Sequence, residues 1–192
     1  KNNIFIGLKG KKFDGSNYAN EAIKNKALIA IVSKIQTKNK SKKFMVKDTL
    51  KFLNHYSSKV RQVKNIKAIS ITGSSGKTSL KELLGHSLSK LASTIYSKKS
   101  FNNKFGVPLA LSEIRKKNSF GVFELGMDRK GEIENLAKII KPDVGIITNI
   151  SYAHIKNFKN ISGIASAKAE IIDQISDNGI IILNRDDKFF NF

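Results

Sequence analysis

The chain has 192 residues, of which 40% are hydrophobic, and this length suffices for one full domain and part of another. It contains no cysteine, which excludes disulfide bonds and thiolate metal sites, and no apolar run approaches membrane-spanning length. The net charge is +20, but only four of the 35 basic residues are arginine, and the lysines are not interleaved with aromatic residues. We therefore expect solvated lysine-rich surfaces, with no nucleic-acid partner and no membrane insertion.

Residues 1–64 are predicted to form a small α/β unit, because strand patterns alternate with helix patterns. Asp14-Gly15-Ser16, in the loop after the first strand, is typical of a plain turn, and nothing in this unit's chemistry alone names a ligand. The predicted strands are 4–8, 27–32 and 44–46, and the predicted helices are 18–25 and 50–63.

A second unit, residues 65–192, repeats strand and helix regularly. Continuously apolar strands such as 144–150 indicate burial on both faces, as in a parallel sheet covered by helices. We therefore expect an α/β fold, with a parallel sheet flanked by helices in this second domain. The predicted strands are 68–72, 94–96, 120–124, 144–150 and 179–183, and the predicted helices are 77–91, 109–116, 132–140 and 162–175.

A glycine-containing turn lies between the first strand of this unit and its first helix. Glycine permits the backbone angles that aim N–H groups at an anion, and the N-terminus of the following helix reinforces that attraction. Ile71 occupies the position where the usual phosphate-loop spacing has a glycine, so a glycine-rich turn with a solvated lysine remains the alternative. The predicted phosphate-binding residues are Gly73, Ser74, Ser75, Gly76, Lys77, Thr78 and Ser79.

In a parallel sheet, ligands bind at the carboxyl ends of the strands. Glu124 ends one predicted strand, His154 follows another on a loop, and Thr78 follows the first. Together they offer a carboxylate, an imidazole and a hydroxyl for a magnesium site beside bound phosphates. Separately, a glutamate can cap a neighbouring helix, and a lone histidine is usually structural.

Lys168 lies on the apolar face of the predicted helix 162–175, between Ile164 and Ile171. A buried ammonium there is costly to desolvate. Its head group therefore either reaches solvent along the helix surface or serves as a neutral amine. A neutral amine can react with carbon dioxide to form a carbamate, which resembles a carboxylate as a magnesium ligand.

Five motifs in this order resemble those of the Mur ligases, and the shortened phosphate loop of that family accounts for Ile71. The resemblance extends to residues 5–15 (FIGLKGKKFDG), which look like the uridine-nucleotide-binding N-terminal domain of the family. The five motifs are 72–78 (TGSSGKT), 102–109 (NNKFGVPL), 124–133 (ELGM…GEI), 148–154 (TNISYAH) and 167–171 (AKAEI).

The resemblance implies an ATP-dependent amide-bond ligase of peptidoglycan precursor synthesis. Such an enzyme joins D-alanyl-D-alanine to UDP-N-acetylmuramoyl-tripeptide through an acyl phosphate, in the cytoplasm and as a monomer. By the same resemblance, Lys77 binds the β- and γ-phosphates, Thr78 holds one magnesium ion, and Glu124 and His154 hold a second. Lys168, as a carbamate, orients that second ion. The implied substrate-binding residues are Asn102, Asn103, Lys9, Asp14 and Gly15.

The chain begins at Lys1 rather than at methionine and ends at Phe192, soon after a predicted strand. We expect a fragment that lacks the C-terminal domain of the family and is inactive by itself. Two other functions remain open. One is a sister ligase that adds an amino acid, or glutamate to folate, and the other is a non-catalytic nucleotide- or nucleic-acid-binding module.

Overall fold

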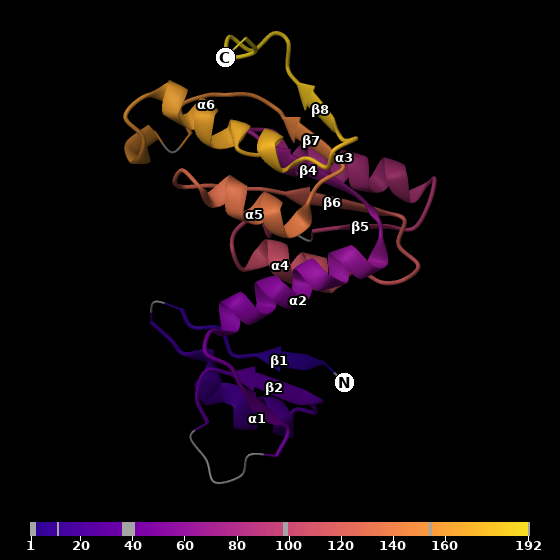
Figure 1. The fold of residues 1–192 in the computed structure, drawn as a ribbon, viewed down its shortest axis with the longest axis vertical. Coiled ribbons are helices and arrows are strands. Elements are labelled where there is room, and N and C mark those ends of the chain that lie inside the picture. The colour runs from indigo at the N-terminus through magenta and orange to yellow at the C-terminus, as the bar shows by residue number, and fades with distance from the viewer. Residues whose placement is uncertain (1–2, 11, 36–40, 98–99, 154, 192) are drawn as a thin grey trace. The chain divides into compact units, whose positions relative to one another are not determined.

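The computed structural model describes residues 3–10, 12–35, 41–97, 100–153 and 155–191. The chain folds into two compact units, Lys1–Tyr56 and Ser57–Phe192 (Figure 1). The change from one to the other lies within helix α2 (Thr49–Lys64), whereas the sequence placed the boundary at the C-terminal end of the same helix. No helix in the described ranges has the length and apolar character that crossing a bilayer requires.

The first unit is built on a three-stranded parallel sheet in the order β1-β2-β3. Its small core joins Ala19, Ala30 and Val32, against which Phe5 and Ile23 pack. The strands are β1 (Ile4–Ile6), β2 (Ile29–Val32) and β3 (Lys43–Met45), and they are accompanied by the 3-10 helix η1 (Gly15–Tyr18) and helix α1 (Ala19–Lys24).

The second unit has a five-stranded parallel sheet in the order β5-β6-β4-β7-β8 (Figure 1). The predicted α/β fold with a parallel sheet flanked by helices is therefore confirmed. Its strands are β4 (Lys67–Thr72), β5 (Thr94–Tyr96), β6 (Phe120–Glu124), β7 (Val144–Ile147) and β8 (Ile180–Leu183). Its helices are α3 (Lys77–Ser89), α4 (Gly106–Ser112), α5 (Glu132–Ile140) and α6 (Ile161–Ala169), with short 3-10 turns η2 (Ile155–Asn157) and η3 (Ile172–Gln174).

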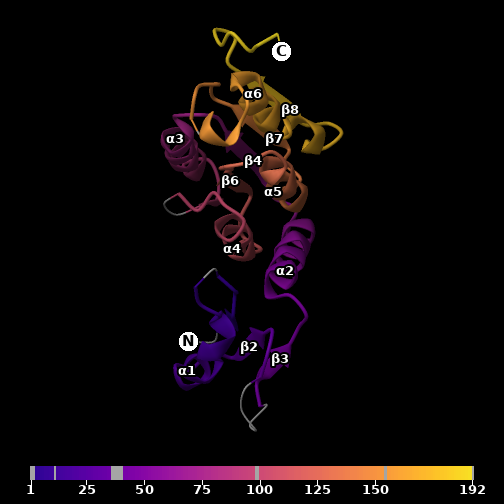
Figure 2. The same ribbon diagram turned by 90° about the vertical axis from the view of Figure 1, so that its left-hand side faces the viewer.

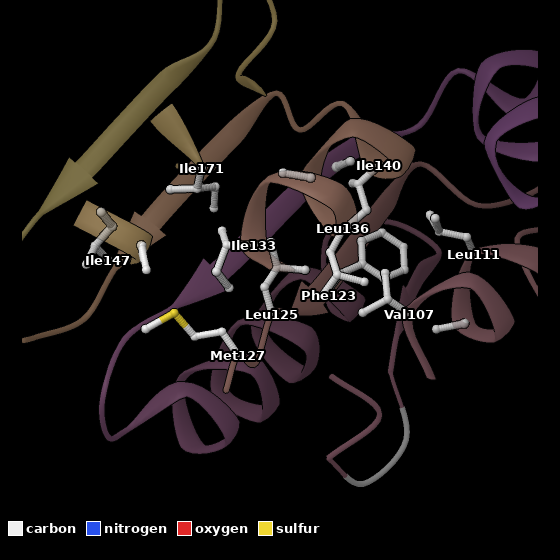
Figure 3. Close-up of a cluster of buried hydrophobic side chains, with 14 of the residues drawn as sticks. Val107, Leu111, Phe123, Leu125, Met127, Ile133, Leu136, Ile140, Ile147 and Ile171 are labelled. Atoms are coloured by element: carbon white, nitrogen blue, oxygen red, sulfur yellow. The ribbon is translucent and has the colours of Figure 1, made fainter. Parts of the chain in front are cut away.

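Helices cover both faces of this sheet, so side chains on both faces of its strands are buried, and the strand sequences are continuously apolar. Figure 2 shows α3 on one side of β4 and β6 and α5 on the other. Because successive side chains of a strand point to opposite faces, Ile71 packs under α3, whereas Ala68 belongs to the core on the α5 side. The larger core lies on the α5 side, where Phe123 is enclosed by residues from α4 and α5 (Figure 3).

Two helices, α4 and α6, differ from their predicted extents by three residues or more at one or both ends. Helix α4 begins at Gly106, three residues earlier than predicted, because the Asn103 Oδ1 accepts hydrogen bonds from the N–H groups of Phe105 and Gly106, both at 3.0 Å. Helix α6 ends at Ala169, and the remainder of the predicted helix becomes the turn η3. The side chain of Glu170, just beyond α6, accepts from the N–H of Gly131 and so holds the first turn of α5. The hydrophobic periodicity used for the prediction contains neither of these side-chain hydrogen bonds, one local and one between distant segments.

Candidate functional site

The loop between β4 and α3 has the backbone that anion binding requires. Gly73 and Gly76 have φ angles of 146° and 77°, in the region that L side chains rarely adopt. Gly76 precedes the first residue of α3, so the unpaired N–H groups of that helix start face the same side as the loop. This segment therefore has the strand–loop–helix form that the sequence predicted for a phosphate-binding loop.

The end of β7 holds this loop in shape. Thr148 donates through Oγ1 to the Ser75 carbonyl at 2.7 Å, and the Asn149 Oδ1 accepts from the Ser75 N–H at 3.0 Å. A Cβ on Gly73 would lie only 1.8 Å from the Thr148 Oγ1, so a glycine is needed there for space as well as for φ. The loop is thus preorganised by the neighbouring strand rather than by its own residues alone.

Glu124 connects three segments at the carboxyl edge of the sheet. It is 1% exposed, and its two oxygens accept from the Thr78 Oγ1 at 2.7 Å and from the Asn102 Nδ2 at 2.8 Å. The strand register explains this meeting, since Glu124 pairs with Ile71, two residues before the loop begins. Thr78 gives its single hydroxyl proton to Glu124, which leaves its lone pairs available to a cation.

Two lysines share this edge. The Lys77 Nζ donates to the Gly73 carbonyl at 2.7 Å; burial lowers the Lys77 pKa, and the negative charge of Glu124 opposes that shift. Lys168 is only 3% exposed, so its head group does not reach bulk solvent. The pKa of Lys168 falls to about 8, first because burial disfavours the charged amine and second because of the positive charge on Lys77.

The structure brings together Lys77, Thr78, Asn102, Glu124 and Lys168, all of which the sequence singled out. His154 lies outside the described residues. Asn103 is used, through its Oδ1, at the start of α4. The remaining predicted residues, Lys9, Asp14 and Gly15, lie in the first unit.

The three residues predicted to contact the substrate in the first unit form one turn. Lys9 and Asp14 pair through their backbones, and Gly15 packs so closely that a Cβ on it would lie 2.8 Å from the Gly7 carbonyl carbon. Asp14 accepts from the Ser16 N–H at 2.9 Å and pairs with Lys34 at 3.1 Å, and these two partners lower its pKa. The observed contacts of Asp14 are those of a capped turn.

The donor set at the sheet edge fits a hard divalent cation. Thr78 and Glu124 supply hydroxyl and carboxylate oxygens, which are the atoms that Mg²⁺ selects, and the carboxylate is already desolvated. Among the described residues, no group of three or more His, Cys, Asp or Glu side chains forms a metal site by itself. A magnesium ion would therefore also need oxygens from elsewhere, such as phosphate, a carbamate or water.

The sequence reasoning passed over the residues that support the loop. Thr148 and Asn149 were read only as part of a motif, and Ser151, whose N–H donates to the Ser74 Oγ at 2.8 Å, was not considered. The rule that residues directly after a strand form the site would have found Thr148 and Asn149. Lys81, which is fully buried one turn after the loop, carried no signal, because an exposed and a buried lysine look alike in sequence.

The comparisons with known proteins agree with this geometry. A family model described as the Mur ligase middle domain matches residues 71–192, which include the loop, Glu124 and Lys168. The chain belongs to the Mur ligase family.

Several Mur ligases match nearly the whole chain. A UDP-N-acetylmuramoyl-tripeptide--D-alanyl-D-alanine ligase from Buchnera aphidicola is 38% identical over 98% of the chain, and the corresponding ligase of Escherichia coli is 34% identical over 95%. The chain spans 41% and 40% of the length of these two relatives.

Solved Mur ligase structures share the fold. MurF from Acinetobacter baumannii superposes with a TM-score of 0.90 at 38% identity, covering 97% of this chain and 41% of its own. MurF from Thermotoga maritima, solved in complex with ADP, superposes with a TM-score of 0.87 at 30% identity, covering 97% of this chain and 43% of its own.

Proposed function

We propose that this protein is the ATP-dependent ligase that adds D-alanyl-D-alanine to UDP-N-acetylmuramoyl-tripeptide in peptidoglycan precursor synthesis. One observation carries the proposal: the preorganised anion loop lies beside a buried carboxylate and a buried lysine at one edge of the sheet. The names of the relatives, at 34–38% identity, supply the substrates. We place the reaction in the cytoplasm and expect a monomer.

In this proposal, residues 73–79 bind the phosphates of ATP. The loop N–H groups and the start of α3 supply donors, and the ADP complex of the Thermotoga relative supports a nucleotide here. The Lys77 ammonium, now hydrogen-bonded to the Gly73 carbonyl, would exchange that neutral acceptor for the charged oxygens of the outer phosphates. Because Lys77 is partly desolvated, that exchange is worth more than it would be on the surface.

Thr78, Glu124, His154 and a carbamate on Lys168 are the proposed magnesium ligands. When bound, magnesium neutralises charge on the phosphates and so makes the terminal phosphorus easier for a carboxylate to approach. The protein's own part is to fix the ligands. Asn102 donates to one oxygen of Glu124 and Thr78 to the other, so the carboxylate cannot rotate freely.

The chemistry proceeds in two balanced steps. The terminal carboxylate of the tripeptide attacks the γ-phosphorus of ATP, which releases ADP and leaves an acyl phosphate. The amine of D-alanyl-D-alanine then attacks the acyl carbon, and phosphate and a proton leave as the amide forms. A carboxylate is a poor electrophile, and phosphorylation supplies its leaving group. The protein contributes orientation and positive charge, chiefly through Lys77.

The low pKa of Lys168 supports a carbamate. With a pKa of about 8, roughly a tenth of the Lys168 amine is neutral at pH 7, whereas an ordinary lysine is almost fully protonated. The neutral amine attacks carbon dioxide, a C–N bond forms, and one proton is released. The resulting carbamate anion would replace the repulsion between Lys168 and Lys77 by an attraction.

We assign residues 1–64 to binding of the UDP-linked substrate and residues 65–192 to binding of ATP. Lys9, Asp14 and Gly15 would contact the uridine-sugar part, and Asn102 and Asn103 would lie near the transferring phosphate or the substrate carboxylate. Asp14 already has two partners, so its contribution would be to hold the turn while backbone groups meet the ligand.

Two measurements test the function. Calorimetric titration of the protein with ADP and MgCl₂ should show binding that Lys77→Met weakens at least about tenfold, as expected for a lost charged hydrogen bond. Lys90→Met, an exposed lysine just beyond the other end of α3, is the matched control and should bind normally. Equal binding by wild type and Lys77→Met would overturn the phosphate assignment.

The second measurement uses the full-length protein and follows phosphate release with ATP and a panel of acceptors. Release that requires both the UDP-linked tripeptide and D-alanyl-D-alanine supports the assignment. Release with a single amino acid, or with glutamate and folate, would instead identify a sister ligase and overturn it.

A further inference from the structure

A second lysine of helix α3, Lys81, is fully buried and has no part in the function proposed above. Its Nζ donates to the Ser97 carbonyl at 2.7 Å and forms an ion pair with Glu82 at 2.9 Å, whose side chain is half-exposed. A buried ammonium is kept in a fold only where its partners are well placed, because removing it from water is costly. The positions of Ser97 and Glu82 therefore indicate which structural elements Lys81 connects.

Lys81 joins α3 to the edge of the sheet that carries Glu124. Ser97 directly follows β5, and its N–H donates to the Val122 carbonyl of β6 at 3.3 Å. Val122 lies two residues before Glu124 on that strand. The Lys81 side chain is thus connected through Ser97 to the strand that ends at the proposed metal ligand.

Thr78 and Lys81 are one helical turn apart, on the same side of α3. The helix consequently makes two polar contacts with neighbouring strands: Thr78 to Glu124 at the end of β6, and Lys81 to Ser97 at the end of β5. One hydrogen bond alone would allow α3 to turn or slide about it. Two contacts a turn apart fix both its rotation and its position along its axis.

Gly85, one turn after Lys81, shows that α3 must approach β5 closely. A Cβ on Gly85 would lie 2.5 Å from the Tyr96 ring, so only glycine lets the helix reach this position. Tyr96 precedes Ser97 in the chain. The close approach and the Lys81 contact therefore act at the same place, and each is independent evidence that the α3–β5 spacing is specified.

We propose that Lys81 is a positioning residue for the magnesium–phosphate site. It holds α3 against β5 and β6 so that the Thr78 hydroxyl and the Glu124 carboxylate keep the separation that a magnesium ion requires. Magnesium accepts little departure from octahedral geometry, whereas the loop N–H groups can follow a phosphate through a small shift. Loss of Lys81 should therefore weaken magnesium-dependent binding more than nucleotide binding as such. The inference rests on the proposed function, since it presumes a metal-bound nucleotide at this loop.

The experiment measures the ADP dissociation constant in MgCl₂ and in EDTA, and takes the ratio as the magnesium enhancement. Lys81→Met keeps the length and apolar stem of the side chain but removes its charge. Glu82→Gln is the matched control, because it removes the ion pair and leaves the Lys81–Ser97 hydrogen bond. Gly85→Ala forces α3 away from β5 without altering Lys81.

The expected result is an enhancement about tenfold lower in Lys81→Met, as for a lost charged hydrogen bond, with ADP affinity in EDTA nearly unchanged. Gly85→Ala should show the same selective loss, and Glu82→Gln should behave as wild type. An unchanged enhancement in Lys81→Met, or an equal fall of both affinities, would overturn the inference. If Lys81→Met does not fold, the ratio for Gly85→Ala, which tests the same α3–β5 spacing, decides the inference. A wild type without any enhancement would instead refute the proposed function.

Discussion

Replacing Lys168 by methionine should stabilise the fold in carbon-dioxide-free buffer, even though it removes a proposed functional group. The side chain is 3% exposed, and its ammonium is both desolvated and close enough to Lys77 to be repelled. Methionine is similar in length and has no charge to bury. The functional requirement and the stability of the fold are therefore opposed at this position.

The pKa of Lys168 gives the size of the effect. It falls from 10.5 to about 8, and each pH unit corresponds to about 1.4 kcal/mol, so burying the charged amine costs about 3 kcal/mol at pH 7. The folded-state pKa is below the unfolded one, so between pH 8 and 10.5 the unfolded chain holds a proton that the folded chain has lost. The free energy of unfolding of the wild type should therefore rise with pH across this window. The advantage of Lys168→Met should be full below pH 8 and absent above 10.5.

Urea denaturation followed by circular dichroism from pH 7 to 10.5 measures this difference, with Lys130→Met, an exposed lysine, as the control. The control should change the free energy of unfolding by less than about 0.5 kcal/mol at every pH. Adding bicarbonate should stabilise the wild type but not Lys168→Met, because only the wild type can form the carbamate. A variant that is less stable than wild type at pH 7 in carbon-dioxide-free buffer, by an amount independent of pH, would refute the reasoning.

Three further predictions concern the loop, the carboxylate and the fold. Gly73→Ala should abolish ADP binding and strongly lower the melting temperature, because the new Cβ would lie 1.8 Å from the Thr148 side chain. Gly76→Ala has open space around it and should lower the free energy of unfolding by only about 1–2 kcal/mol, because its φ is 77°. Glu124→Gln should lower the magnesium enhancement of ADP affinity and destabilise by about 1–3 kcal/mol in urea denaturation, because both its oxygens accept hydrogen bonds and an amide nitrogen cannot. Asp143→Ala should lower the free energy of unfolding by about 3 kcal/mol in urea denaturation, because the largely buried Arg61 guanidinium loses the carboxylate 2.8 Å away. A loss below about 1 kcal/mol would contradict this prediction.

The sequence by itself determined the α/β class and the place of the glycine-containing loop between β4 and α3. Both follow from local signals: apolar runs of strand length, helical periodicity, and the Gly73 and Gly76 pair between a strand and a helix. The rule that parallel sheets bind ligands at one edge also brought Thr78 and Glu124 into one prediction, and they are hydrogen-bonded. Those signals suffice because each depends on residues close together in the chain, or on the general rule that parallel strands share a carboxyl edge.

Tertiary structure alone decided how each polar side chain is used. Lys168 and Lys81 are both buried lysines on helices of the second unit, yet Lys168 lies near a like charge and Lys81 donates to a backbone carbonyl. The distant segments that bury them make that difference. Thr148 holds the loop through the Ser75 carbonyl, although the two residues are 73 positions apart in the chain. Desolvation and hydrogen bonding of these side chains depend on which strands become neighbours. No local sequence pattern predicts the strand order β5-β6-β4-β7-β8.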